Sequence, residues 1–179
     1  NAYCQDNEIS WIDWEIEPDG RELGEFVRWL IRLRREHIVF HRYRFFKGPG
    51  APGSEIKDIT WLRPDGRERR PEDWGDPEDR CLAYILSGEA HGYHLTASGE
   101  PEGDETFLAI LNAHPEHVSF TLPGERFGKS WVRQLDTADE EPLQPQIHRA
   151  GETCRVEGRS LVLLMWSDGS SAARDPEPW

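Results

Sequence analysis

The chain of 179 residues carries 34 acidic against 21 basic side chains, and its formal net charge of -13 argues against nucleic acid or an anionic membrane surface as partner. Its longest purely apolar run, residues 161–166, is far shorter than the roughly 18 residues that a membrane-spanning helix needs. The three cysteines form no CxxC pair, which argues against a zinc knuckle or a disulfide framework and indicates reduced thiols in a cytoplasmic protein.

The chain opens on a polar, amide-rich segment, residues 1–14, which has no initiator methionine and leads into Trp11 and Trp14. Four of its side chains combine an aromatic ring for stacking with mixed hydrogen-bond donors and acceptors and are candidate ligand contacts: Tyr3, Gln5, Asp6 and Asn7. A second interpretation is that the Asn and Asp side chains bond to their own backbone and fold the loop back on itself. Both interpretations are open from the sequence, and the two tryptophans are expected to be packing anchors.

An amphipathic helix is predicted over residues 20–38. Asp19 and Glu22 form a D-x-x-E pattern, which predicts that the Asp19 side chain accepts a hydrogen bond from the backbone N–H of Glu22 at the helix start. Six apolar side chains then recur at spacings of three and four, with charged residues between them: Leu23, Phe26, Val27, Leu30, Leu33 and Ile38.

The second part of the chain is predicted to be an antiparallel β-sandwich, so the expected fold class is mainly β. Residues 47–54, Lys-Gly-Pro-Gly-Ala-Pro-Gly-Ser, cannot hold regular structure and are the expected boundary. Residues 89–105 are predicted to be a long polar loop and residues 167–179 a polar tail. Seven short apolar or alternating runs between turns predict strands at 59–62, 81–87, 106–112, 117–122, 131–136, 153–156 and 160–166.

No catalytic constellation stands out in the sequence. Hydrolysis of a glycosidic bond usually needs two carboxyl groups with different protonation states. Asp6 with Glu8 and Asp13 with Glu15 alternate within a loop and are interpreted as solvated surface residues. A G-x-S-x-G nucleophile elbow does not occur either.

Two histidine pairs, His91 with His94 and His114 with His117, invite a metal interpretation. Neither pair has a third ligand nearby or the i, i+4 helical spacing of common zinc sites. The sequence therefore predicts no metal site, and it indicates no cofactor.

The opening run Asn-Ala-Tyr-Cys-Gln-Asp-Asn-Glu, with Ser-Trp and Asp-Trp following, closely resembles the loop after the last barrel strand of bacterial glycogen debranching enzymes. These enzymes are the isoamylase-type branch of the α-amylase superfamily of glycoside hydrolases. The similarity continues through Asp58-Ile59-Thr60-Trp61-Leu62-Arg63-Pro64-Asp65-Gly66, Glu72-Asp73-Trp74 and Leu111-Asn112-Ala113-His114, and it reaches to about residue 166.

The resemblance implies that residues 1–46 are the final loop and final helix of a truncated (β/α)8 barrel. It implies that residues 47–166 are the C-terminal β-sandwich and 167–179 a tail. The parent enzyme would hydrolyse α-1,6 branch linkages in glycogen with retention and without a redox cofactor. Its catalytic carboxylates would lie upstream of Asn1, so the isolated chain is expected to be inactive while its opening loop lines the substrate.

Without the barrel, the apolar stripe of the 20–38 helix would be bare, and burying six such side chains is worth about 10 kcal/mol. We therefore expect the helix to pack on the sandwich, to self-associate, or to bind the upstream barrel. Two other functions are open from the sequence. One is a stand-alone glucan-binding module that uses an exposed Trp61, Trp74 or Trp131, and the other is a purely structural domain that caps the barrel.

Overall fold

The computed structural model describes residues 3–42, 45–48, 57–88, 103–124, 129–139 and 144–167. The chain divides into two compact units, Asn1–His41 and Arg42–Trp179. Most of the predicted glycine-rich boundary, most of the predicted 89–105 loop and nearly all of the predicted tail lie outside the described residues. The division predicted between residues 46 and 47 stays a prediction.

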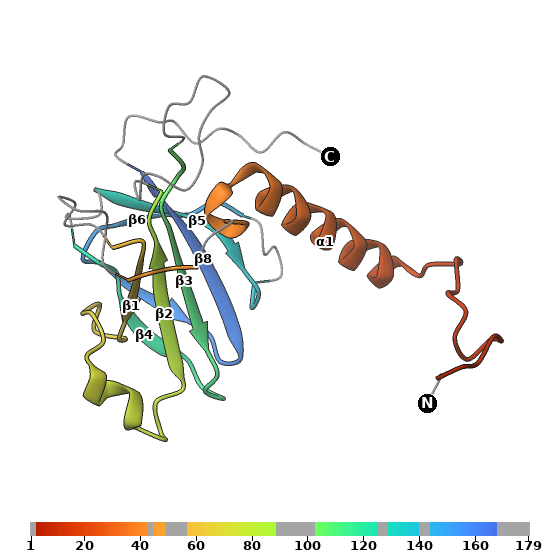
Figure 1. The fold of residues 1–179 in the computed structure, drawn as a ribbon, viewed down its shortest axis with the longest axis horizontal. Coiled ribbons are helices and arrows are strands. Elements are labelled where there is room, and N and C mark those ends of the chain that lie inside the picture. Colours follow the sequence, from red (N-terminus) through yellow and green to blue (C-terminus); the bar gives the residue numbers. More distant parts are fainter. Residues whose placement is uncertain are drawn as a thin grey trace. The chain divides into compact units, whose positions relative to one another are not determined.

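The first unit contains helix α1 (Pro18–Glu36) and the short 3-10 helix η1 (Ile38–Phe40), drawn in orange in Figure 1. The predicted helix is confirmed, but its predicted cap is wrong. Helix α1 begins at Pro18, whose fixed φ suits the first helical position, and the preceding Glu17 makes no side-chain cap. Asp19 therefore lies inside the first turn, where its charge complements the positive end of the helix dipole.

The apolar side of α1 has no cover within its own unit. No residue of the helix is buried, and Leu23, Val27 and Ile31 are all exposed. Phe26, Leu30 and Leu33 are half-buried, and what covers this side of α1 stays a prediction.

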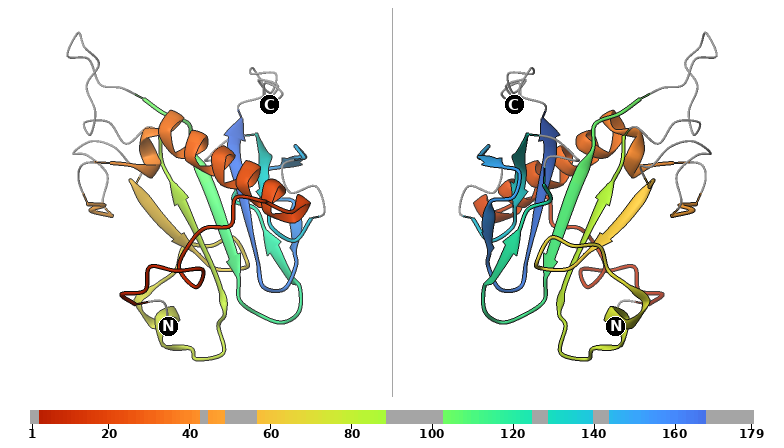
Figure 2. Two further views of the ribbon diagram at one scale, coloured as in Figure 1. Left: turned by 90° about the vertical axis from the view of Figure 1, so that its right-hand side faces the viewer. Right: turned by 90° about the vertical axis from the view of Figure 1, so that its left-hand side faces the viewer.

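The strands that the structure describes in the second unit all pair in the antiparallel sense (Figure 2). A six-stranded sheet has the order β1-β2-β3-β8-β5-β6, and β4 pairs with β7 in a two-stranded sheet. The strands are β1 (Ile59–Leu62), β2 (Cys81–Leu86), β3 (Phe107–Asn112), β4 (Val118–Thr121), β5 (Ser130–Asp136), β6 (Ile147–Arg149), β7 (Thr153–Val156) and β8 (Ser160–Ser167). The predicted mainly β, antiparallel fold is thus confirmed.

All seven predicted strands are present, and the sequence pattern missed β6. This edge strand has only three residues, Ile147–Arg149, and pairs with the first part of β5. Ile147 is 71% exposed, so β6 has no buried face and leaves no alternating signal in the sequence.

The core is one cluster that draws side chains from both sheets. The two-stranded sheet contributes Phe120, Cys154 and Val156, and the six-stranded sheet contributes most of the remainder. Trp131 of β5 is completely buried. The other large-sheet members of the cluster are Leu62, Cys81, Ala83, Ile85, Leu108, Ile110, Val162 and Leu164.

The buried Asn112 side chain ties the two sheets together at one end of the sandwich. It lies at the end of β3, and its Nδ2 is 2.9 Å from the carbonyl oxygens of Glu116 and Glu157 and 3.2 Å from that of Val156. Its Oδ1 accepts from the His114 N–H at 3.0 Å. One amide thereby connects the end of β3, the β3–β4 connection and the end of β7.

The β7–β8 turn passes against the same connection. A Cβ added to Gly158 would stand 2.3 Å from the carbonyl oxygen of Pro115, so a larger residue could not occupy this position without moving backbone. This close approach explains why a glycine occupies the turn between β7 and β8.

Two thiols belong to the core. Burial raises the pKa of Cys81 to about 11, and the nearby Asp79 carboxylate adds to the shift. Burial raises the pKa of Cys154 to about 11 as well, with Asp136 as the next cause. Both thiols are therefore buried and protonated at neutral pH, which makes them poor nucleophiles.

The substitution Asn112→Ala should lower the free energy of unfolding of the sandwich by roughly 1–3 kcal/mol, because carbonyl groups that the amide satisfies would be left buried without a donor. Urea unfolding followed by tryptophan fluorescence measures the change. Ser119→Ala, an exposed polar residue on β4, is the control and should change stability by less than about 0.5 kcal/mol. Equal effects of the two substitutions would contradict the role assigned to Asn112.

The stability of the sandwich should fall as the pH rises from 9 to 11. The folded pKa values of Cys81 and Cys154 are raised above the ordinary value of 9.0, so the unfolded chain loses these protons first. The stabilisation is complete below pH 9 and is lost as the pH approaches 11. Urea midpoints measured across this range should fall less steeply for the double variant Cys81→Ala/Cys154→Ala, which retains the raised pKa of Tyr84; an identical fall would refute the assignment.

Candidate functional site

The opening loop of the first unit is folded back on itself by Asn7. The backbone N–H groups of Ser10 and Trp11 both donate to the Asn7 carbonyl oxygen, at 2.9 and 3.0 Å. The Asn7 Oδ1 accepts from the Ile9 N–H at 3.1 Å, and the Ser10 hydroxyl donates to the Gln5 carbonyl at 2.7 Å. Asn7 therefore builds an Asx turn of the kind that short polar side chains form with their own backbone.

Side chains of the loop also bond to one another. The Trp11 indole N–H donates to Asp6 Oδ1 at 2.8 Å, and the Asn7 Nδ2 donates to Gln5 Oε1 at 3.3 Å. The Tyr3 ring is 82% exposed. Of the four predicted sugar-contacting residues, the loop brings Gln5 and Asn7 into direct contact, and the contact of all four with a sugar stays a prediction.

Two carboxylates of the loop accept hydrogen bonds from within the loop and the segment that follows it. Asp13 Oδ1 accepts from the Glu15 N–H at 2.9 Å, as Asp6 accepts from the indole of Trp11. Trp11 and Trp14 are 63% and 80% exposed, so the packing predicted for them is not found within the first unit. Their packing against a barrel wall stays a prediction.

The second unit carries a cluster of three aromatic rings, which we call the aromatic platform: Trp61 of β1, Tyr84 of β2 and Trp74 of the 3-10 helix η2 (Pro71–Gly75). Trp61 and Tyr84 are direct partners across the β1–β2 pair, with ring centroids 5.4 Å apart. Trp74 meets Trp61 edge to face at 5.6 Å. Trp74 is 53% exposed, so one member of the platform presents a large apolar surface to solvent.

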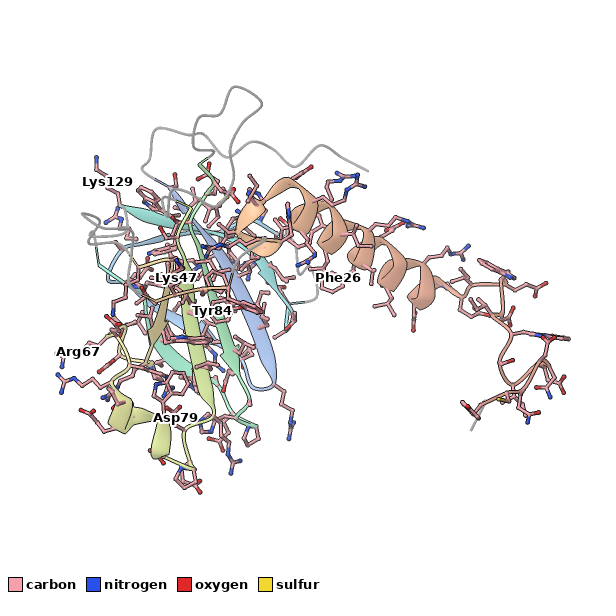
Figure 3. All side chains as sticks on the ribbon, viewed as in Figure 1. Phe26, Lys47, Arg67, Asp79, Tyr84 and Lys129 are labelled. Atoms are coloured by element: carbon pink, nitrogen blue, oxygen red, sulfur yellow. The ribbon has the colours of Figure 1, made fainter. Side chains whose placement is uncertain are left out.

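Buried Arg69 packs against the Trp74 ring of the platform. Its side chain is only 4% exposed, and its guanidinium carbon lies 5.2 Å from the centre of the Trp74 ring. It donates to three backbone carbonyl oxygens, those of Leu62 at 3.2 Å, Asp73 at 3.2 Å and Cys81 at 2.8 Å, and it pairs with Asp79 at 2.5 Å. Figure 3 shows Asp79 in the segment before β2 and Tyr84 within that strand.

Sequence reasoning overlooked Arg69. Its only signal there is a basic residue between the Pro64-Asp65-Gly66 turn and Pro71, which is indistinguishable from the neighbouring surface arginines. Only the fold reveals that this one arginine is buried against the carbonyl groups of two strands and a 3-10 helix.

One of the three tryptophans proposed from the sequence as a sugar-stacking residue is misplaced. Trp131 is fully buried, and its indole N–H is directed at the Pro123 carbonyl oxygen at 3.4 Å. The inward face of β5 holds it in the core, where no ligand can reach it. Trp61 and Trp74 belong to the platform instead.

The part of the chain that the structure describes contains no group of three or more His, Cys, Asp or Glu side chains placed to hold a metal ion. His114 and His117 belong to the β3–β4 connection, while His91 and His94 lie outside the described residues. No helix of the described ranges has the length and apolar character to cross a membrane.

Comparison with known proteins places the geometry in context. The family model "Isoamylase, C-terminal" matches residues 58–167. The "Glycogen operon protein GlgX homolog" of Mycobacterium tuberculosis is 42% identical over 168 residues, which cover 92% of this chain and 23% of that protein. The isoamylase of Pseudomonas amyloderamosa is 25% identical over 174 residues, covering 92% and 20% of the respective chains.

A third relative is the glycogen debranching enzyme of Pectobacterium atrosepticum, 37% identical over 124 residues that cover 69% of this chain and 15% of that enzyme. The chain thus spans less than a quarter of the length of these curated relatives.

The substitution Asp6→Ala should loosen the opening loop without affecting the sandwich. Loss of the acceptor for the Trp11 indole should raise hydrogen exchange at that N–H by roughly two- to tenfold, the range expected for one net hydrogen bond. Indole N–H exchange measured by NMR tests this, with Asp6→Asn, which keeps an acceptor oxygen, as the matched control. Unchanged exchange in Asp6→Ala would show that the contact does not order the loop.

Proposed function

The chain belongs to the isoamylase C-terminal family, and on this basis we propose that it forms the C-terminal part of a glycogen debranching enzyme, one that hydrolyses α-1,6 branch linkages. The observation that carries the proposal is the family match over residues 58–167. The relatives that bear debranching and isoamylase names support it, because their similarity extends over most of this chain.

In this proposal the chain itself is not catalytic. A retaining glycosidase needs one carboxylic acid to protonate the leaving oxygen and one carboxylate, about 5 Å away, to attack the sugar. Two of the carboxylates in the opening loop, Asp6 and Asp13, are engaged as hydrogen-bond acceptors that shape the loop. The catalytic pair is therefore assigned to the part of the enzyme that the relatives possess in addition to the segment matched here.

The opening loop would contribute substrate contacts. Loops at the C-terminal ends of barrel strands build the active-site face of such enzymes. Tyr3 would stack on a glucose ring, and Gln5, Asp6 and Asn7 would bond to its hydroxyls. The hydrogen bonds within the loop favour this role, since side chains already held in place lose less entropy when a ligand binds.

Helix α1 would be covered by the barrel. Leu23, Val27 and Ile31 form an apolar stripe that nothing within residues 3–41 buries, and a preceding barrel is the partner that we propose for it. Self-association through the same stripe is the alternative arrangement. We also propose a cytoplasmic location, which fits three cysteines that all carry free thiols.

A chimera tests the proposal. When this chain replaces the matching segment of the Pectobacterium glycogen debranching enzyme, the product should release linear chains from glycogen, whereas the chain alone should release none. Within the chimera, Asp6→Ala should lower kcat/KM about tenfold, because one substrate hydrogen bond and the order of the loop are lost together. Reducing-end assays on glycogen measure both effects.

Ser119→Ala in the chimera is the control, since Ser119 is exposed on the sandwich and should leave kcat/KM unchanged. Hydrolysis by the isolated chain, or a folded chimera that leaves the branches intact, would overturn the proposal.

A further inference from the structure

We propose that the aromatic platform is a glucan-binding site separate from the opening loop, and that it takes a linear α-1,4-linked segment of the polysaccharide. This inference rests on the proposed function for the identity of the sugar. The site itself rests on the arrangement of Trp61, Trp74 and Tyr84 and of the charged residues around them.

Trp74 offers a large apolar surface to solvent. An indole is among the largest apolar side chains, and Trp74 is 53% exposed although the Trp61 ring, itself 5.4 Å from Tyr84, lies 5.6 Å away. The ring contacts Trp61 through an edge-to-face pair and Arg69 through its π-face, which leaves the exposed part of the indole available. The apolar C–H face of a glucose ring fits such a surface, because stacking removes apolar area from water on both partners.

The Trp74 ring is held rigidly by its neighbours. Arg69 is buried, and its guanidinium is fixed by three carbonyl groups and by Asp79. It lies against Trp74, and Trp61 limits the ring from the side. The indole is therefore held in one orientation before any ligand arrives, so little side-chain entropy is lost on binding.

Charged side chains in the segment that leads to Trp74 form what we call the polar rim of the platform. Arg63 pairs with Asp73 at 3.1 Å, and the Arg70 N–H donates to the other Asp73 oxygen at 2.8 Å. Arg70 also lies 3.9 Å from Glu72, and both of these side chains are largely exposed. Two basic side chains, Arg63 and Arg70, and three acidic ones, Asp65, Glu72 and Asp73, thus pair with one another in the segment that leads to Trp74.

Because each of these charged side chains has a partner of opposite sign, the rim favours an uncharged ligand over an anionic or cationic one. Guanidinium groups donate and carboxylates accept, so the rim can bond to hydroxyl groups, which do both. An apolar ring bordered by both kinds of polar group is complementary to a sugar chain.

The platform lies in the second unit and the opening loop in the first. A branched polysaccharide offers many equivalent chains, so two sites on one protein can hold it at once. The second contact then becomes intramolecular and increases the overall affinity for the polymer beyond that for a short oligosaccharide.

The experiment uses the whole chain and its Trp74→Ala, Trp74→Tyr and Phe45→Ala variants. Native electrophoresis in gels containing glycogen gives an apparent Kd for each. Trp74→Ala should bind at least about tenfold more weakly, as expected for removal of a central aromatic anchor. Trp74→Tyr should retain most of the affinity, and Phe45→Ala, which removes a ring that is 95% exposed, should bind like the unmodified chain.

A second measurement does not depend on the folding of Trp74→Ala. Maltoheptaose added to the unmodified chain should shift the indole N–H resonance of Trp74, identified by its absence in Trp74→Tyr, and should leave that of the buried Trp131 in place. Cellohexaose, the β-linked counterpart, should produce no such shift.

An unmoved Trp74 resonance, an equal response to cellohexaose, or full affinity in a folded Trp74→Ala would each overturn the proposal. If Tyr3→Ala lost glycogen binding while Trp74→Ala kept it, the affinity would belong to the opening loop, and the proposal would be overturned too. The chimera assay is independent of these results: debranching without binding at Trp74 removes only the platform site, and binding at Trp74 without debranching removes only the proposed function.

Discussion

The sandwich depends on keeping a two-stranded sheet pressed against a much larger one. A pair of four-residue strands such as β4 and β7 is not stable by itself in water, so it persists only through the core that it shares with the other sheet. Phe120, Cys154 and Val156 supply the apolar half of that attachment. Asn112 supplies the polar half, because its amide satisfies carbonyl groups that the close approach of the two layers would otherwise bury unpaired.

Arg69 is a second buried polar side chain whose hydrogen bonds connect separate segments of the chain. There the buried group is a cation, which must be paired and hydrogen-bonded to be tolerated inside a protein. Its partners come from β1, η2 and the start of β2, so one side chain fixes the long connection between the first two strands. As a result, an aromatic residue in a connection without regular strands is as firmly placed as one in the sheet. Buried polar groups thus connect the two sheets at Asn112 and fix the exposed Trp74 ring at Arg69.

The sequence predicts this protein well where burial leaves a periodic trace. The alternating pattern located β1 and β7, and apolar spacing located α1, since each of these elements has one apolar face. It failed where the deciding contact is not periodic. Pro18 rather than Asp19 determines where α1 begins, and the burial of Trp131 depends on which face of β5 the core occupies. For the opening loop, residue types indicated both sugar contact and self-bonding, and the fold shows the self-bonding in the Asn7 turn.

The two edges of the six-stranded sheet affect how readily this protein aggregates at high concentration. A free strand edge invites another chain to extend the sheet, which is a common beginning of aggregation. Here β6 is three residues long and carries His148 and Arg149, and β1 is four residues long with its outer side engaged by the Arg69 N–H, which donates to the Trp61 carbonyl at 2.8 Å. Both edges are therefore poor templates for a further strand. A molecule that binds at either edge of the six-stranded sheet would therefore do so through side chains rather than by adding a strand, and side-chain recognition can be specific and reversible.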